Sequence, residues 1–333
     1  MPRLSDRRYL HTPVATVSLV VGLIAHVPVS VRAEQPAWVT RNTEQLLARV
    51  QAAPRLALEM SEFVLKLPTE DWELGMVSSI AASADGLFYV LQRNTDIDAV
   101  IVVDGDGNVK RSWGRGLYSI AHSIRIDSAG NVWTVDSGNS WIYKFTPDGE
   151  QLLGIDVGEM PDKVSPFRGA ADIAFGPDGH LFVADGYGNA RVLEYDSAGR
   201  RLREWGEAGS GSGEFNLVHG IAIDTSSIIY VADRENGRIQ RFDRNGNLLG
   251  IWDGLGRVVS IHIDGDALWV AVQRLDQPGG SVGWLMRLNR DDGSVDGLVA
   301  IPETHGVTIS PRGEPLVGLR PNRILWYRHV PGK

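Results

Sequence analysis

Three histidines stand at equivalent positions of a phrase that recurs along this chain. In its clearest copies, a short alternating apolar–polar stretch meets a glycine turn, and a second stretch then ends in aspartate. The six copies begin at Ser78, His122, Ala171, His219, Val259 and His305. In a ring of six such units, His122, His219 and His305 would converge on the axis, whereas a lone histidine would be an ordinary turn or hydrogen-bonded residue. Three histidines with an open fourth position are the ligand set of a catalytic zinc ion.

A second set of candidates follows the second stretch of each copy. Arg93 and Arg234 occupy this position, and Tyr187 lies one residue further on in its own copy. These loops should share one rim of the ring, where a guanidinium can hold a carboxylate through its planar fork. A tyrosine beside a cation loses its proton more readily than a free phenol does. The repeats alone leave open that both arginines form ordinary surface ion pairs.

The same repeat predicts the fold. Each copy continues with a third stretch, a hairpin and a fourth stretch, so each unit of about forty to fifty residues holds four strands. This is the pattern of a β-propeller blade, and six copies predict an all-β, six-bladed propeller over residues 61–330. Residues 63–67 are predicted to be the outer strand of the last blade, which closes the ring. The aspartates that end the second stretch are expected to close turns: Asp136, Asp185 and Asp233.

Composition excludes several classes of protein. The chain has 333 residues, no cysteine and a formal net charge of -8. Without cysteine there are no disulfides, thiolate nucleophiles or cysteine-built metal sites. A nucleic-acid reader would normally present a basic face, so we expect no nucleic-acid partner. We expect a monomer.

The N-terminal region resembles an export signal. Residues 1–33 combine three early arginines, an apolar run and a Val-Arg-Ala cleavage sequence, although an uncleaved membrane anchor is the alternative. Residues 34–60 are predicted to be a partly helical lead-in that Asn42 or Thr43 could cap. We expect the mature protein to be exported, to the periplasm or the medium, and to have no membrane contact once the signal is cleaved.

Several stretches resemble the peptidyl-α-hydroxyglycine α-amidating lyase family, six-bladed propellers of NHL-type repeats. The resemblance is strongest in Ala-Asp-Gly-Tyr within 183–191, in 213–219 and in Ala-Asp-Arg-Glu-Asn-Gly-Arg within 231–240, and it extends to 113–122. It implies zinc on the three histidines, Tyr187 as the catalytic tyrosine, and Arg93 and Arg234 as active-site arginines. It also implies cleavage of the N–Cα bond of a small peptidyl or N-acyl hydroxyglycine, which gives an amide and glyoxylate.

The resemblance implies a structural calcium ion as well, and here this chain departs from the family pattern. Two calcium ligands would be the backbone carbonyls of Ile80 and Ile124, but Gly306 stands where the family has an aspartate. We therefore expect calcium to bind weakly or not at all. Two other functions stay open on the same fold, namely a metal-dependent lactonase-like hydrolase and a non-catalytic NHL-repeat binding propeller.

Overall fold

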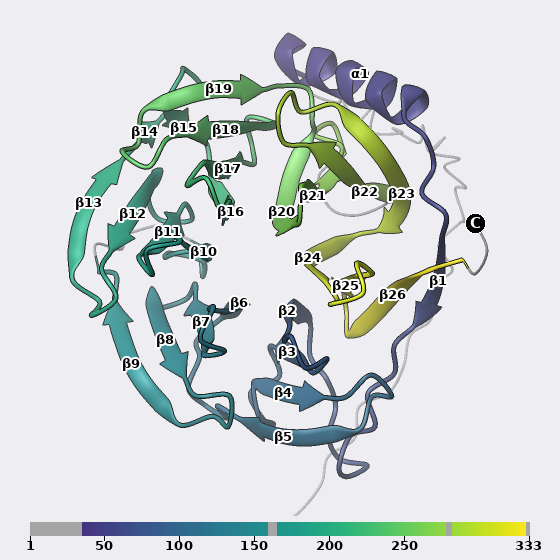
Figure 1. Cartoon of the computed structure of the whole chain (residues 1–333), viewed down its shortest axis with the longest axis vertical. Helices are drawn as coiled ribbons and strands as arrows, with labels where there is room; N and C mark the ends of the chain where they lie inside the picture. Colours follow the sequence, from purple (N-terminus) through teal and green to yellow (C-terminus); the bar gives the residue numbers. More distant parts are fainter. Residues whose placement is uncertain (1–34, 159–164, 278–281, 331–333) are drawn as a thin grey trace, which may run out of the picture. The chain divides into compact units, whose positions relative to one another are not determined.

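The computed structural model describes residues 35–158, 165–277 and 282–330. Over these residues, six four-stranded antiparallel sheets surround a central axis as the blades of a propeller (Figure 1). The prediction of an all-β, six-bladed propeller is therefore confirmed. The predicted signal peptide, residues 1–33, lies outside the described residues.

Each blade runs from an inner strand near the axis to an outer strand at the rim of the ring. Blades 1 to 3 consist of β2 (Val77–Ala82), β3 (Phe88–Gln92), β4 (Val100–Val103), β5 (Val109–Trp113); β6 (Ala121–Ile126), β7 (Val132–Asp136), β8 (Trp141–Phe145), β9 (Gln151–Asp156); and β10 (Asp172–Phe175), β11 (Leu181–Asp185), β12 (Arg191–Tyr195), β13 (Arg201–Trp205). Blades 4 to 6 consist of β16 (Val218–Ile223), β17 (Ile229–Asp233), β18 (Arg238–Phe242), β19 (Leu248–Trp252); β20 (Arg257–Asp264), β21 (Ala267–Gln273), β22 (Val282–Asn289), β23 (Val295–Pro302); and β24 (Thr304–Ile309), β25 (Pro315–Leu319), β26 (Arg323–His329), β1 (Leu58–Glu62). A short parallel ribbon, β14 (Glu207–Ala208) with β15 (Glu214–Phe215), links blades 3 and 4.

The turn chemistry of the repeat explains why each blade forms. In blade 2, Gly130 adopts a φ of 83°, a left-handed conformation that costs glycine little because it has no Cβ. Asp127 Oδ1 accepts hydrogen bonds from the backbone N–H groups of Ala129 and Asn131, which holds β6 against β7. Apolar side chains from facing sheets then pack between the blades, as Ile124 of blade 2 does in a cluster with residues of blade 1.

The ring closes through a different segment from the one predicted. Strand β1 pairs with β26 over residues 58–62, so the predicted outer strand at 63–67 is wrong. Within residues 63–67, buried and exposed side chains alternate without extending the sheet: Phe63 and Leu65 are buried, and Val64 is 66% exposed. The Phe63 ring packs edge-on against Phe88 and Trp326, with centroids 5.5 and 5.3 Å away. Residues 63–67 therefore fill the junction between blades 6 and 1.

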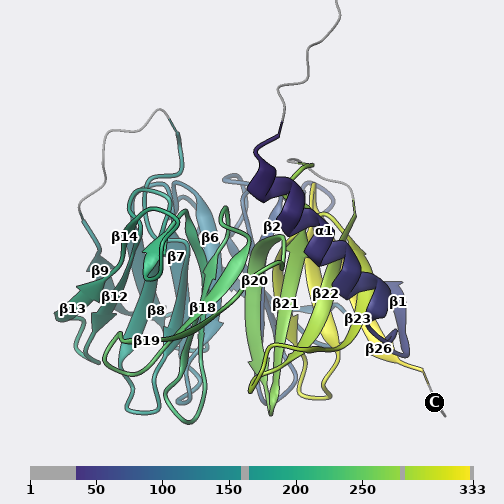
Figure 2. The same ribbon diagram turned by 90° about the horizontal axis from the view of Figure 1, so that it is seen from above.

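The lead-in contains a helix, α1 (Ala37–Ala52), that packs where blades 4 and 5 meet (Figure 2). Its apolar face buries Leu46 completely in that core. Asn42 lies inside the helix rather than at its start: its side chain donates to the Gly237 carbonyl and accepts from the Gly256 N–H. The predicted cap is thus wrong, because this polar residue is used for docking to the propeller.

The turn aspartates act as the sequence predicts. All three accept hydrogen bonds that fix the loops at one end of the blades. Their partners include the N–H groups of Ser119 and Ile120 for Asp136, the Arg191 side chain for Asp185, and the Asn216 N–H and Arg238 side chain for Asp233.

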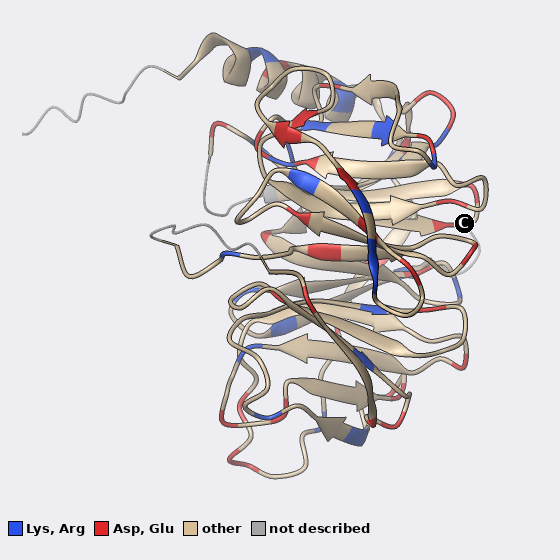
Figure 3. Ribbon diagram, turned by 90° about the vertical axis from the view of Figure 1, so that its left-hand side faces the viewer, with Lys and Arg blue, Asp and Glu red and all other residues tan. Residues whose placement is uncertain are grey.

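Charged residues of both signs are scattered over the blades and their loops. In the side view of Figure 3, Lys and Arg positions are interspersed with Asp and Glu positions along the ribbon. Among the described residues, no helix has the length and apolar character needed to cross a membrane.

Candidate metal centre

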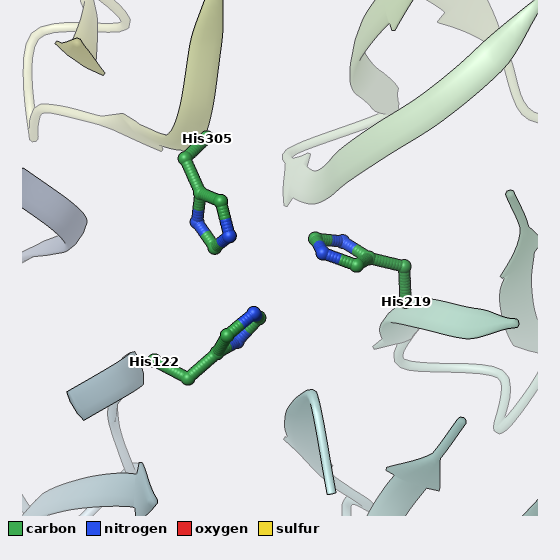
Figure 4. A group of neighbouring side chains, drawn as sticks. All are labelled: His122, His219 and His305. Carbon is green, nitrogen blue, oxygen red and sulfur yellow. The ribbon is translucent and has the colours of Figure 1, made fainter. Parts of the chain in front are cut away.

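The side chains of His122, His219 and His305 point toward one another near the axis (Figure 4). They come from the inner strands β6, β16 and β24, and their potential ligand atoms lie within 4.8 Å of one another. In all three strands the pairing register shifts at the histidine, which is left without a partner in the ladder. Such an irregularity can redirect a side chain, and here it accompanies the turn toward the axis.

Each histidine is held in one orientation by a hydrogen bond to the blade that follows its own. Each Nδ1 atom lies within hydrogen-bond distance of the carbonyl oxygen at the equivalent position of the next blade. The distances are 2.6 Å from His122 to Ala171, 2.8 Å from His219 to Val259 and 2.8 Å from His305 to Ser78. A carbonyl can only accept, so Nδ1 carries the proton and Nε2 keeps a free lone pair. Carbonyls that orient ligand imidazoles in this way are typical of metal sites.

Burial also favours the neutral imidazole. It lowers the pKa of His122 and of His219 well below the usual value, and it lowers the pKa of His305 to about 3. Charge repulsion acts in the same direction. For His122 it comes chiefly from the charge that the other two histidines would carry if protonated, for His219 from Arg234 and for His305 from Arg93. Because a metal binds the deprotonated nitrogen, these imidazoles are ready to act as ligands near neutral pH.

Tyr187 contacts two of the three imidazoles from the loop that follows β11. Its hydroxyl oxygen is 2.9 Å from Nε2 of His122 and 2.9 Å from Nε2 of His219. The single hydroxyl proton can satisfy only one of these lone pairs at a time. A cation bound by the Nε2 atoms would satisfy both, so the donor set and its geometry fit a zinc ion.

The pKa of Tyr187 does not follow the simple expectation from sequence. Burial raises it, and the positive charges of Arg234 and Arg93 oppose that rise without cancelling it. The predicted lowering would therefore require the additional charge of a cation on the imidazoles.

Arg93 reaches the same centre from the loop after β3. Its Nε donates to Ser78 Oγ at 2.7 Å and to the Ala121 carbonyl at 3.0 Å, and its guanidinium lies 5.3 Å from the Phe167 ring centroid. Burial lowers its pKa to about 10. Its buried Nη2 has no hydrogen-bond partner among the described residues. For Arg93, the surface ion-pair alternative is therefore wrong.

Arg234 follows β17 and is 23% exposed. Its Nε lies 3.0 Å from Glu235 Oε1, so this arginine does form an ion pair with its neighbour, yet its charge also acts on Tyr187. The predicted site residues Arg93, Arg234 and Tyr187 are thus brought together with the three histidines.

Sequence reasoning missed two residues near this centre. Phe167 stacks on Tyr187 with ring centroids 4.9 Å apart, and nothing in its local sequence indicated this. Arg320 follows β25 as Arg93 follows β3, so extending the repeat comparison to the last blade would have found it. It is exposed, has no ion-pair partner among the described residues, and its charge contributes to lowering the pKa of His305.

The implied calcium site does not fit this chain. The Ile124 carbonyl, one expected ligand, accepts a hydrogen bond from Arg125 Nη1 at 3.2 Å. The other Arg125 nitrogen, Nη2, lies 2.6 Å from Asp172, a buried carboxylate that lines a small axial cavity of about 10 Å³. A Cβ at Gly306 would lie 2.7 Å from the Ser78 carbonyl oxygen, so an aspartate there would clash. The Arg125 guanidinium thus binds the Ile124 carbonyl and the Asp172 carboxylate, two oxygen groups that a calcium ion near the axis could otherwise use as ligands.

Comparison with known proteins supports the repeat assignment. The NHL repeat family matches residues 167–195 and 215–242, which contain Tyr187, His219 and Arg234. The solved structure described as streptogramin B lyase has a TM-score of 0.57 and 16% identity, and the match covers 81% of this chain and 97% of that one. At that identity the likeness shows the fold alone.

Two curated relatives carry names that refer to peptide amidation. The chain is 33% identical over 174 residues to the Rattus norvegicus protein named peptidylglycine alpha-amidating monooxygenase, covering 48% of this chain and 18% of that protein. It is 28% identical over 197 residues to the Caenorhabditis elegans protein named probable peptidyl-alpha-hydroxyglycine alpha-amidating lyase, covering 51% of this chain and 56% of that one. The matched segments thus span less than two thirds of either relative. The chain is therefore an NHL-repeat propeller with relatives, at about 30% identity, named for peptide amidation.

Proposed function

We propose that this protein is a zinc-dependent lyase that cleaves the N–Cα bond of peptidyl-α-hydroxyglycine substrates, or of small N-acyl hydroxyglycines, into an amide and glyoxylate. The observation that carries the proposal is the position of the Tyr187 hydroxyl, 2.9 Å from Nε2 of both His122 and His219. Relatives named peptidyl-alpha-hydroxyglycine alpha-amidating lyase support the same reaction class.

The chemistry divides among a few residues. Zinc held by His122, His219 and His305 would act as a Lewis acid toward the substrate hydroxyl group. Tyr187, as the phenolate, accepts the hydroxyl proton. The C–O bond becomes the aldehyde C=O of glyoxylate, the N–Cα bond breaks with its electron pair on nitrogen, and that nitrogen takes up a proton to give the amide.

The arginines position the substrate. Arg93 is anchored through Nε to Ser78 and Ala121, so its buried Nη2 is free to bind a carboxylate oxygen. Arg234 is near enough for its charge to favour the phenolate form of Tyr187. Because the reacting bond lies next to the carboxylate, holding that group fixes the hydroxyl relative to Tyr187.

The rival functions are less well supported by this geometry. A lactonase-like hydrolase would build its metal site from carboxylates, but the carboxylate lining the axial cavity, Asp172, is already paired with Arg125. A non-catalytic binding propeller has no need for three converging imidazoles beside a half-buried tyrosine. Export as a monomer that acts without nucleic acid or membrane remains part of the proposal.

The test combines metal content with product analysis. The purified protein should contain about one zinc ion per chain and should release glyoxylate from an α-hydroxyglycine model peptide such as α-hydroxyhippurate. His219→Ala should lose the metal, whereas His329→Ala, an exposed histidine, should retain it. Normal zinc content in His219→Ala would contradict the three-histidine centre. Formation of the free carboxylic acid in place of the amide product would contradict the lyase.

A further inference from the structure

A separate cavity of about 280 Å³ lies beside the metal centre, between blades 1 and 2. It is lined by the loop after β3 and by the segment that leads into β6. Its apolar lining residues are Ile97, Ala99, Tyr118, Ile120, Ala121 and Phe167. Thr95 and Ser119 also line it and are exposed, so the cavity is accessible from solvent.

Two polar side chains of this cavity, Gln92 and Tyr118, are already hydrogen-bonded within the protein. Gln92 accepts hydrogen bonds from two backbone N–H groups, those of Gly75 and Asn94, and its Nε2 donates to two backbone carbonyls. The Tyr118 hydroxyl is 2.8 Å from Thr134 Oγ1. An apolar group can therefore pack against Gln92 and Tyr118 without leaving a hydrogen-bonding group of either side chain unsatisfied.

The cavity and the metal centre share one wall, formed by Arg93 and Phe167. Both residues line the cavity, and Phe167 also stacks on Tyr187. Arg93 is fixed by its contacts with Ser78 and Ala121, and its Nη2 is left without a partner among the described residues. A molecule held by Arg93 at the centre is thus within reach of the cavity.

We propose that this cavity binds the apolar side chain, or the acyl group, that precedes the hydroxyglycine unit of the substrate. This inference rests on the proposed lyase function. A cavity of about 150 Å³ is large enough to bind benzene, so 280 Å³ has room for a phenyl ring. The protein then selects substrates with an aromatic or large aliphatic residue before the glycine, and disfavours charged ones.

Binding of unreactive analogues tests the selection without turnover. We would titrate the zinc-loaded full chain with N-acetyl-Phe-Gly and N-acetyl-Ala-Gly, which lack the hydroxyl group, and measure the dissociation constants by calorimetry. Burying the phenyl ring should make the Phe compound bind about ten- to a hundredfold more tightly. Equal affinities would overturn the proposal.

Two variants locate the selection in this cavity. Thr95→Trp should narrow the cavity and remove most of the preference for Phe, while leaving affinity for the Ala compound nearly unchanged. Asn322→Trp is the matched control, because Asn322 is exposed and holds the equivalent position in blade 6, two residues after Arg320. Ile120→Ala should widen the cavity and favour N-acetyl-Trp-Gly over the Phe compound. A Thr95→Trp variant that weakens both analogues equally would place the selection elsewhere.

The glyoxylate assay separates this inference from the function on which it rests. Glyoxylate release with no preference among the analogues would leave the lyase standing and overturn the cavity assignment. A clear preference that Thr95→Trp abolishes, without glyoxylate from any hydroxyglycine, would support the apolar site and overturn the lyase.

Discussion

At the scale of single residues, the proposed chemistry depends on Tyr187 and on what surrounds it. Its hydroxyl contacts two imidazole nitrogens, its ring stacks on Phe167, and arginine charge opposes the effect of burial on its pKa. A half-buried phenol among cationic groups is poised to exchange a proton, and such groups cluster at functional sites.

Tyr187→Phe tests the role of that hydroxyl. The ring and its stacking are kept, so zinc content and melting temperature should stay close to those of the wild type. Loss of the general base should reduce glyoxylate release by roughly a hundred- to ten-thousandfold. An unchanged turnover number, measured under saturating substrate, would remove Tyr187 from the chemistry.

Arg234→Lys tests the guanidinium rather than the charge. Lysine keeps the positive charge but lacks the planar fork, so binding of a carboxylate substrate should weaken by about tenfold or more. A substrate amidated at that carboxylate should respond much less. If both substrates lose equally, Arg234 acts through the fold and its ion pair with Glu235 rather than through the substrate.

At the scale of elements, the inner strands are tied together by contacts between blades. Each centre histidine donates to the next blade, and Arg125 of β6 reaches Asp172 of β10 at 2.6 Å. Ser123 Oγ also donates to Asp172. The inner strands around the axis are therefore crosslinked by side chains of neighbouring blades.

Arg125→Met tests how much the Arg125–Asp172 ion pair contributes to the stability of the propeller. It leaves the Asp172 carboxylate buried without its cation, which should lower the free energy of unfolding by about 3 kcal/mol. Arg323→Met is the matched control, since its ion pair with Glu62 is about half exposed and its loss should lower the free energy of unfolding much less. Urea unfolding curves measure both, and added Ca²⁺ should leave the curve of the zinc-loaded wild type unchanged. A large stabilisation by Ca²⁺ would show that calcium binds through other ligands.

At the scale of the whole molecule, the buried histidines make stability depend on pH. Burial holds the pKa values of His122 and His219 well below the usual value, and that of His305 at about 3. Histidine in an unfolded chain titrates near pH 6.5. Below that pH the unfolded state takes up protons that the native state refuses, so native stability decreases as the pH falls.

For metal-free protein we expect this loss between about pH 6.5 and pH 3. Each deeply buried histidine should contribute on the order of 2 kcal/mol between pH 7 and pH 5. His219→Gln should therefore show a shallower decline than the wild type in unfolding curves recorded after chelation. His329→Gln, at an exposed position, should keep the wild-type slope. Identical slopes in all three proteins would mean that the centre histidines are not held neutral.

The repeat makes the fold and much of the centre predictable from the amino-acid sequence. Turn glycines such as Gly130 and turn aspartates such as Asp127 act within a few residues of themselves, so they specify each blade locally. Six copies then imply six blades, and equal positions in equal blades point to the same axis. For this reason the spacing of the copies is enough to group His122, His219 and His305.

Contacts between different blades are decided only by the tertiary structure. Residues 63–67 carry a strand-like alternation, yet 58–62 pair with β26, because Phe63 and Leu65 are buried where blades 6 and 1 meet. The stacking of Phe167 on Tyr187 and the ion pair between Arg125 and Asp172 likewise join segments that are far apart in the sequence. An alternating apolar pattern indicates only that every second side chain is buried. Which residues cover those side chains depends on how the blades pack when the ring closes.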